Sequence, residues 1–122
     1  MSEIGRLNPS APSDLSQFTG YVQTLEHHLH IRVLGDVSLC DNQQPSHRVL
    51  ARGRSGSEIQ VGSAWLKTAK HGPRTGERFL SITIDDPSLK TPLNIAAFPD
   101  PDADDWVVVW RRRGLQPNSA AA

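Results

Sequence analysis

Apolar and polar residues alternate with a period of two along most of this chain. The clearest run is residues 80–84, where Leu80, Ile82 and Ile84 are separated by Ser81 and Thr83. Alternation of this kind is typical of a strand with one buried face. No window carries the apolar stripe of a helix of a dozen residues. The pattern therefore predicts an all-β protein.

The alternating runs are separated by residues that favour turns, which gives the order of elements. Loops are expected at 8–17, 36–46 and 100–105, and Asp86-Pro87 predicts one short helical turn over 88–90. We predict a single β domain over 1–114, a small antiparallel sandwich or partly open barrel of about seven strands, and a disordered tail over 115–122. The strand-like runs lie near 4–7, 18–25, 29–34, 47–53, 58–67, 78–84, 92–98 and 106–112.

Length, cysteine content and hydropathy limit the class of protein. The chain has 122 residues, of which 37% are hydrophobic, enough for one modest core. Cys40 is the only cysteine, so it has no internal disulfide partner, which favours a reducing compartment. The N-terminus lacks an apolar signal core, and no stretch of about 18 apolar residues is present. We therefore expect a cytoplasmic protein that does not enter a membrane.

The net charge is zero, but the charges are segregated along the chain. Residues 46–78 carry 7 basic and 2 acidic groups, whereas residues 85–105 carry 1 basic and 6 acidic groups. If these blocks lie on different surfaces, one surface can meet phosphates and the other a basic protein. If they interleave in the sheet, they neutralise one another.

A hairpin over 61–84 contains the first candidate surface. Strand alternation allows Trp65 and Phe79 to share a polar face with Lys67. Bases stack on aromatic rings while nearby cations hold the phosphates, so this face predicts nucleic-acid binding. The alternative is ordinary cross-strand or core packing of the two rings. The other cations of this candidate site are Lys70, Arg74 and Arg78.

A second candidate surface is a basic strip on two neighbouring strands. His28, His30 and Arg32 have one parity, and Arg48 and Arg52 match them on the next strand, with His47 and Arg54 expected near the ends of the strip. Such a strip can contact phosphates, or it is simply the solvated face of a half-buried sheet. His28 and His30 have spacing suited to a metal, but no third ligand is placed beside them. We predict no metal and no cofactor.

Residues near the C-terminus and in the acidic turns have mainly structural interpretations. Trp106 and Trp110 bracket an apolar run and are expected in the core. Adjacent carboxylates in turns usually cap strands and solubilise the chain, and no phosphate-binding loop or Gly-x-Ser-x-Gly elbow is present. The protein is therefore not expected to be an enzyme.

The hairpin also carries a family resemblance. Gly62-Ser63-Ala64-Trp65-Leu66-Lys67-Thr68, followed by Phe79-Leu80-Ser81 and Asp85-Asp86-Pro87-Ser88, resembles the signature of the Domain of Unknown Function 736 family. Ile4-Gly5, Phe18-Thr19-Gly20 and Trp110-Arg111 extend the resemblance over most of the chain. The loop 69–77 is longer than usual in that family, and Phe79 stands where Tyr is common. The resemblance implies a short bacterial protein often found on mobile elements, and it implies no catalytic or binding residues.

Two functions of different classes follow from these observations. The first is a non-enzymatic module that binds nucleic acid through Trp65, Lys67, Phe79 and their neighbouring cations. The second is an inhibitor of a host defence complex, of the anti-CRISPR or anti-restriction type, acting through an acidic surface. Either could act as a monomer or a homodimer. The acidic surface would consist of Asp85, Asp86, Asp100, Asp102, Asp104 and Asp105.

Overall fold

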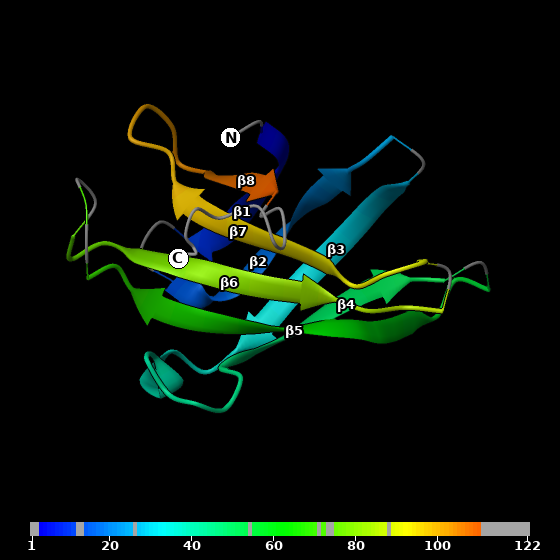
Figure 1. The fold of residues 1–122 in the computed structure, drawn as a ribbon, viewed down its shortest axis with the longest axis horizontal. Coiled ribbons are helices and arrows are strands. Elements are labelled where there is room, and N and C mark those ends of the chain that lie inside the picture. The colour runs from blue at the N-terminus through cyan, green and yellow to red at the C-terminus, as the bar shows by residue number, and fades with distance from the viewer. Residues whose placement is uncertain are drawn as a thin grey trace.

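Eight antiparallel strands close into a barrel in the computed structural model (Figure 1). The structure describes residues 3–11, 14–25, 27–53, 55–70, 72, 75–87 and 89–110. Each strand pairs with the next along the chain, and the last pairs with the first, so the all-β prediction is confirmed. The elements are β1 (Glu3–Ala11), β2 (Asp14–Gln23), β3 (His28–Gly35), the 3-10 turn η1 (Val37–Leu39), β4 (His47–Arg52), β5 (Glu58–Thr68), β6 (Arg78–Ile84), β7 (Leu93–Pro99) and β8 (Trp106–Trp110).

The up-and-down order divides the loops between two ends of the barrel. The β3–β4, β5–β6 and β7–β8 connections lie at the end on the left of Figure 1, and the β2–β3, β4–β5 and β6–β7 connections lie at the right. Strands β5, β6 and β7 cross the front of this view, and β2 and β3 cross the back. The position of an outward-facing residue is therefore given by its strand and by its distance along that strand from the two ends of the barrel.

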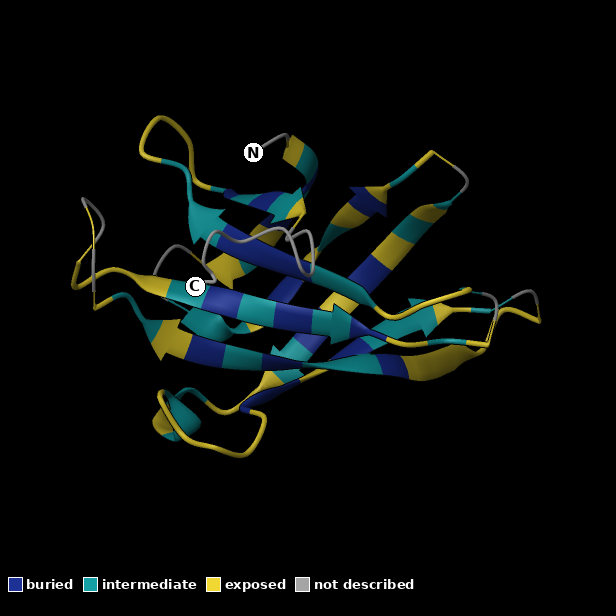
Figure 2. Ribbon diagram, viewed as in Figure 1, coloured by how far each residue is buried: buried dark blue, intermediate teal, exposed yellow. Residues whose placement is uncertain are grey.

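Strand alternation separates a packed interior from a polar exterior. Buried and more exposed residues alternate along the strands, as in β6, where Leu80, Ile82 and Ile84 are at most 1% exposed (Figure 2). The interior is filled by side chains from all eight strands, so the barrel is a packed core. These residues are Leu7, Phe18, Val22, Ile31, Val33, Val49, Val61, Ala64, Leu66, Leu80, Ile82, Ile84, Ile95, Ala97, Trp106 and Val108.

Two glycines allow β1 and β2 to approach each other closely. A Cβ atom on Gly5 would lie 2.1 Å from the carbonyl oxygen of Tyr21, and one on Gly20 would lie 1.9 Å from that of Arg6. Both distances are far below van der Waals contact, so a side chain at either position would push the strands apart. Glycine in a strand often marks such a tight bend where a barrel closes.

The expected loop at 8–17 is largely wrong, because β1 extends to Ala11 and β2 begins at Asp14. Ala11 pairs with Asp14, so the two strands remain paired up to these residues. Proline is tolerated at Pro9 for a geometric reason: β1 pairs with β8 only over Glu3 to Leu7, so Pro9 has a strand partner on one side only.

One smaller prediction also needs correction. Trp106 is in the core as expected, but Trp110 at the end of β8 is 42% exposed. The short helical turn expected at 88–90 begins at Ser88, outside the described residues; beside it, the Leu89 N–H donates to the Asp86 carbonyl oxygen at 2.8 Å. A 3-10 turn, η1, also forms in the β3–β4 loop. Ser88, Arg54, Arg74 and the tail predicted over 115–122 lie outside the described residues.

Candidate nucleic-acid interface

The structure places Trp65, Lys67 and Phe79 together on the outer face of β5 and β6. Lys67 lies directly opposite Phe79, and Trp65 lies opposite Ser81, the residue two positions further along β6. Their inward neighbours Leu66 and Leu80 are buried. The two aromatic side chains and the lysine therefore share one outer surface, which is the arrangement predicted from strand alternation.

Phe98 on β7 extends this aromatic surface, and the sequence interpretation did not include it. The rings of Phe79 and Phe98 are stacked, with centroids 5.3 Å apart and an interplanar angle of 20°. Because one face of each ring is turned toward the other, the edges and the remaining faces are what a ligand could contact. The alternation of Leu93–Pro99 would have indicated Phe98 once β7 was placed beside β6.

The indole of Trp65 also has a structural role. Its Nε1–H donates to the backbone carbonyl oxygen of Gln43 at 3.1 Å, which ties the β3–β4 loop to β5. The indole is partly exposed, so it serves this contact and still presents surface to solvent.

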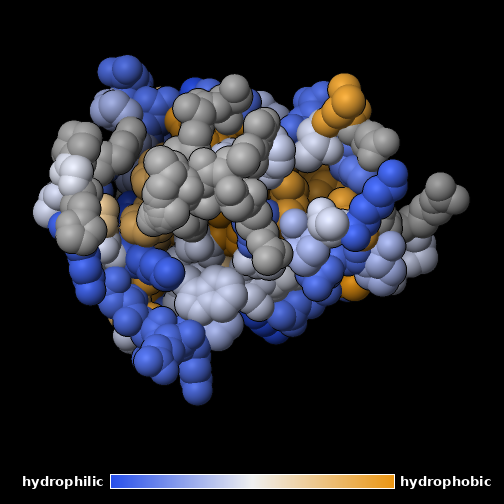
Figure 3. Space-filling view, in the orientation of Figure 1, coloured by the Kyte–Doolittle hydropathy of each residue, from blue (hydrophilic) through white to orange (hydrophobic). Residues whose placement is uncertain are grey.

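Asp41 and Thr68 hold the same loop a few residues away. Asp41 accepts hydrogen bonds from the Thr68 N–H at 2.8 Å and from the Thr68 hydroxyl at 2.9 Å. These bonds lower the pKa of Asp41 below its ordinary value, with smaller contributions from Cys40 and the charge of Lys70. Trp65 and Thr68 therefore fasten the loop on both sides of Lys67, which is exposed. In Figure 3 this loop, at the lower left, is strongly hydrophilic.

The remaining cations predicted for this surface are spread out. Arg78 faces Thr68 at the end of the hairpin, where alternation turns its side chain away from the face of Phe79. Lys70 is exposed in the β5–β6 loop. Arg74 lies outside the described residues. Of the candidate cations in this part of the chain, the structure brings Lys67 to the aromatic surface.

The basic strip predicted on β3 and β4 also lies outside the barrel, and Arg48 connects it to the aromatic surface. Arg48 is exposed and lies opposite Ser63, two residues from Trp65 on the same face of β5. On the other side it lies opposite Leu34 of β3. The two candidate surfaces are thus neighbours around the barrel.

Two arginines of the strip have partners within the protein. Arg32 forms an ion pair with Glu58, with Nε 3.1 Å from Oε2. Arg52 donates from Nη1 to the Gly56 carbonyl oxygen at 3.2 Å. Both residues have exposed side chains, so these contacts are open to competition by solvent or by a phosphate.

His28 and His30 stand beside Tyr21, a residue that the sequence interpretation did not include. His28 stacks on Tyr21 with centroids 5.6 Å apart and an interplanar angle of 12°, and the two histidine rings lie 4.9 Å apart. Among the described residues, no three His, Cys, Asp or Glu side chains form a group that could hold a metal. With Tyr21, the two histidine rings form an aromatic cluster on the same strand face as Arg32.

His47 was expected near the end of the basic strip, and this prediction is wrong. Its side chain points into the barrel and is 2% exposed. Nε2 lies 2.7 Å from the Leu15 carbonyl oxygen and must carry the proton, because a carbonyl can only accept. Nδ1 then accepts from the Ser46 hydroxyl at 2.7 Å. Burial lowers the pKa of His47, an effect partly opposed by its bond to Leu15 and by the charge of Asp36.

Ser46 completes this buried polar pair. Its hydroxyl oxygen accepts from the Leu66 N–H at 2.7 Å, and the residue is 4% exposed. A serine beside a histidine resembles a nucleophile and its base. Here both side chains are enclosed and their hydrogen bonds join β2, β4 and β5, so the pair closes one end of the barrel core.

The acidic residues are divided between the two ends of the barrel. Asp85 and Asp86 follow β6 at one end, and the aspartates of the β7–β8 turn lie at the other. Asp102 and Asp104 are exposed there. In Figure 3 this turn, at the upper left, is hydrophilic. The acidic block of the sequence therefore does not form one continuous surface.

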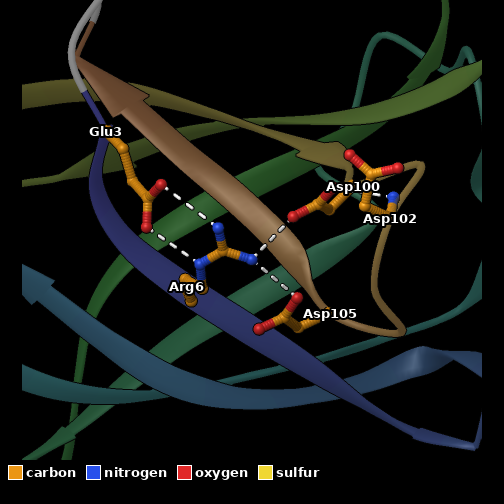
Figure 4. A network of polar contacts seen from close by, with 5 residues as sticks. All are labelled: Glu3, Arg6, Asp100, Asp102 and Asp105. Carbon is orange, nitrogen blue, oxygen red and sulfur yellow. Dashed lines mark hydrogen bonds and ion pairs between the residues drawn. The ribbon is translucent and has the colours of Figure 1, made fainter.

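Arg6 on β1 binds two of those aspartates (Figure 4). Its Nη1 lies 2.8 Å from Asp100 Oδ2 and 2.8 Å from Asp105 Oδ1, while its Nε lies 2.8 Å from Glu3 Oε2. The hydrogen bond to Glu3, then those to Asp100 and Asp105, raise the pKa of Arg6 above its ordinary value. The network fastens the β7–β8 turn to β1, so Asp100 and Asp105 serve the fold.

The described barrel, from Glu3 to Trp110, lies within the part of the chain that one family profile matches. A profile described as Protein of unknown function (DUF736) matches residues 3–113. The chain belongs to the DUF736 family. No curated protein and no solved structure matches it. Among the described residues, no helix is long and apolar enough to span a membrane.

The residues on which the DUF736 resemblance rests occupy three kinds of position in the barrel. Gly5, Gly20 and Gly62 allow close approach of strands, since a Cβ on any of them would lie 2.1 Å or less from a backbone oxygen. Ala64 and Leu80 are fully buried. Trp65, Lys67 and Phe79 face outward, together with the smaller Ser63 and Ser81 of the motif. In this DUF736 barrel, the candidate interface is therefore the outer half of the motif.

Proposed function

We propose that this protein binds single-stranded nucleic acid, without catalysing a reaction, through the outer face of β4, β5 and β6. The observation that carries the proposal is the grouping of Trp65, Phe79 and Lys67 on one surface, with Arg48 beside it. We place this activity in the cytoplasm, as an accessory function of a mobile element.

The physical basis is the pairing of aromatic rings with available cations. Stacking of a base on an aromatic side chain contributes about 1–3 kcal/mol. Lys67 and Arg48 are exposed, and among the described residues neither forms a salt bridge. They can therefore bind phosphates without first breaking an internal ion pair. A duplex buries its base faces, so this surface favours single strands.

The test is fluorescence anisotropy of labelled oligo-dT and of a duplex over a series of salt concentrations. Binding of the single strand should weaken as salt rises, because phosphate contacts release counterions. Lys67→Gln should reduce the slope of log K against log salt by about 0.7, the value for one contact on a single strand. Lys90→Gln, an exposed lysine in the loop at the opposite end, is the matched control. Salt-independent binding, or equal effects of both variants, contradicts the proposal.

A protein partner is the second candidate, and the exposed Asp102 and Asp104 favour it. These carboxylates could occupy a basic groove of a host defence complex. The variant should leave Asp100 and Asp105 intact, because these residues bind Arg6. Asp102→Asn with Asp104→Asn should therefore abolish capture of the partner without disturbing the fold. Unchanged capture by this double variant would reject the acidic surface.

A further inference from the structure

The aromatic surface on β5 and β6 and the basic strip on β3 and β4 are adjacent, and together they define a path for a ligand. From Phe79, the path crosses β5 at Trp65 and reaches Arg48 on β4. It continues to Arg32 on β3, which lies opposite Leu50, the outward residue two positions after Arg48. It ends at the rings of His30, His28 and Tyr21, since Tyr21 lies opposite His30. Aromatic rings thus stand at both ends, with arginines between them.

We infer that a single strand of nucleic acid follows this diagonal track around the outside of β6, β5, β4 and β3. This inference rests on the proposed function. Strands lie about 4.8 Å apart and rise about 3.3 Å per residue, so the track from Phe79 to His30 is about 30 Å long. An extended strand of about six nucleotides spans it, a length within the range of about 4–16 nucleotides bound by small barrels. The first bases stack at Trp65 and Phe79, and the last at His30 and Tyr21.

Glu58 provides the sharpest test, because its carboxylate lies on the track. It holds Arg32 through the 3.1 Å ion pair, and both side chains are partly exposed, at 32% and 48%. A phosphate on the track must compete with this carboxylate for the guanidinium. Removing the negative charge of Glu58 should therefore strengthen the binding of any strand that is long enough to reach Arg32.

The experiment measures anisotropy of labelled dT3, dT6, dT9 and dT12 at one salt concentration. Affinity should rise up to about dT6 and then level off. Glu58→Gln should tighten dT6 binding about two- to fivefold, the range of an exposed ion pair, and should change dT3 binding no more than the control does. The control is Asp104→Asn, which makes the same charge change at an exposed position off the track.

The possible outcomes separate the track from the proposed function. If dT3 binds as tightly as dT6, or if Glu58→Gln and Asp104→Asn have equal effects at every length, the track is overturned and the aromatic surface stands alone. If no oligonucleotide binds at any length, the proposed function itself is overturned, and the track with it. A plateau near six nucleotides together with the specific gain in Glu58→Gln supports both.

Discussion

The inner and outer faces of the β5–β6 hairpin are built from the same two strands and have opposite physical roles. Inside, Ala64, Leu66 and Leu80 are at most 1% exposed and fill the barrel. Outside, Trp65 and Lys67 alternate with them and lie at the surface. One strand segment therefore contains both the residues that determine stability and the residues available to a ligand. A substitution reports on function here only if it is made on the outer face.

The same contrast holds around the whole barrel, and two exceptions test the comparison. Among the described residues, the buried polar side chains are those of Ser46 and His47, which lie at one end of the barrel with satisfied hydrogen bonds. Apolar and aromatic side chains are also partly or fully exposed at several points of the outer surface, among them the group of Trp65, Phe79 and Phe98. A buried polar pair must be hydrogen-bonded to be tolerated, whereas a contiguous group of partly exposed aromatic side chains marks a candidate contact surface.

The largest expected effect comes from two consecutive residues on opposite faces. Leu66→Ala should lower the free energy of unfolding by about 2–5 kcal/mol, because it removes buried methyl groups and leaves a cavity. Lys67→Ala should change it by less than about 0.5 kcal/mol, as for most surface substitutions. Urea denaturation followed by circular dichroism measures both. Comparable losses in the two variants would show that the faces are not distinct.

The next test concerns His47, which belongs to the buried polar pair inside the barrel. The unfolded chain binds a proton on His47 near pH 6.5, but the buried ring in the folded protein binds it only at lower pH. The stability contributed by neutral His47 should therefore be complete above about pH 6.5 and should fall as the pH decreases below this value.

This pH dependence can be isolated by substitution. The difference in unfolding free energy between wild type and His47→Gln should shrink as the pH is lowered from 8 to 5. His28→Gln, at an accessible histidine on the outer face, is the control. If the difference between wild type and His47→Gln stays constant over this range, His47 does not titrate as the structure indicates.

A smaller loss of stability than that of Leu66→Ala is expected on the outer face. Trp65→Phe keeps an aromatic ring but removes the Nε1–H that donates to Gln43. It should lower the free energy of unfolding by about 0.5–1.5 kcal/mol, the net contribution of one hydrogen bond. Quenching of tryptophan fluorescence by bound oligo-dT should be lost, because Trp106 is buried and Trp110 lies at the far end of β8. Quenching that persists in the variant would exclude Trp65 from the interface.

Much of this fold was predictable from local pattern, because every strand pairing except that of β1 with β8 joins consecutive strands. The alternation around Leu80 placed β6 and its faces correctly, and with β5 it indicated that Trp65 and Phe79 share a surface. Period-two alternation cannot show closure, however, since the pairing of β1 with β8 joins the two ends of the described chain. It also cannot show that Pro9 continues a strand whose other side is unpaired there.

The site was less predictable, because it depends on which strands are neighbours. Phe98 and Tyr21 join the aromatic surfaces only through the registers of β7 with β6 and of β2 with β3. His47 was misplaced because parity alone does not tell which alternate set points inward when His47 and Arg48 are both polar. The loss of a continuous acidic surface likewise follows from the up-and-down order, which sends Asp85 and Asp100 to opposite ends.

The contact between β1 and β8 has a consequence for how the chain folds. Seven of the eight strand pairings join consecutive strands, so closing the barrel requires one contact between segments far apart in sequence, and loop-closure entropy makes such contacts slow. A circular permutant that links the start of β1 to the end of β8 and opens the chain between β4 and β5 converts the β1–β8 pairing into a local one. The β4–β5 pairing then becomes the distant one. The permutant's equilibrium stability should change little, and stopped-flow refolding should show whether the position of that single distant contact sets the folding rate.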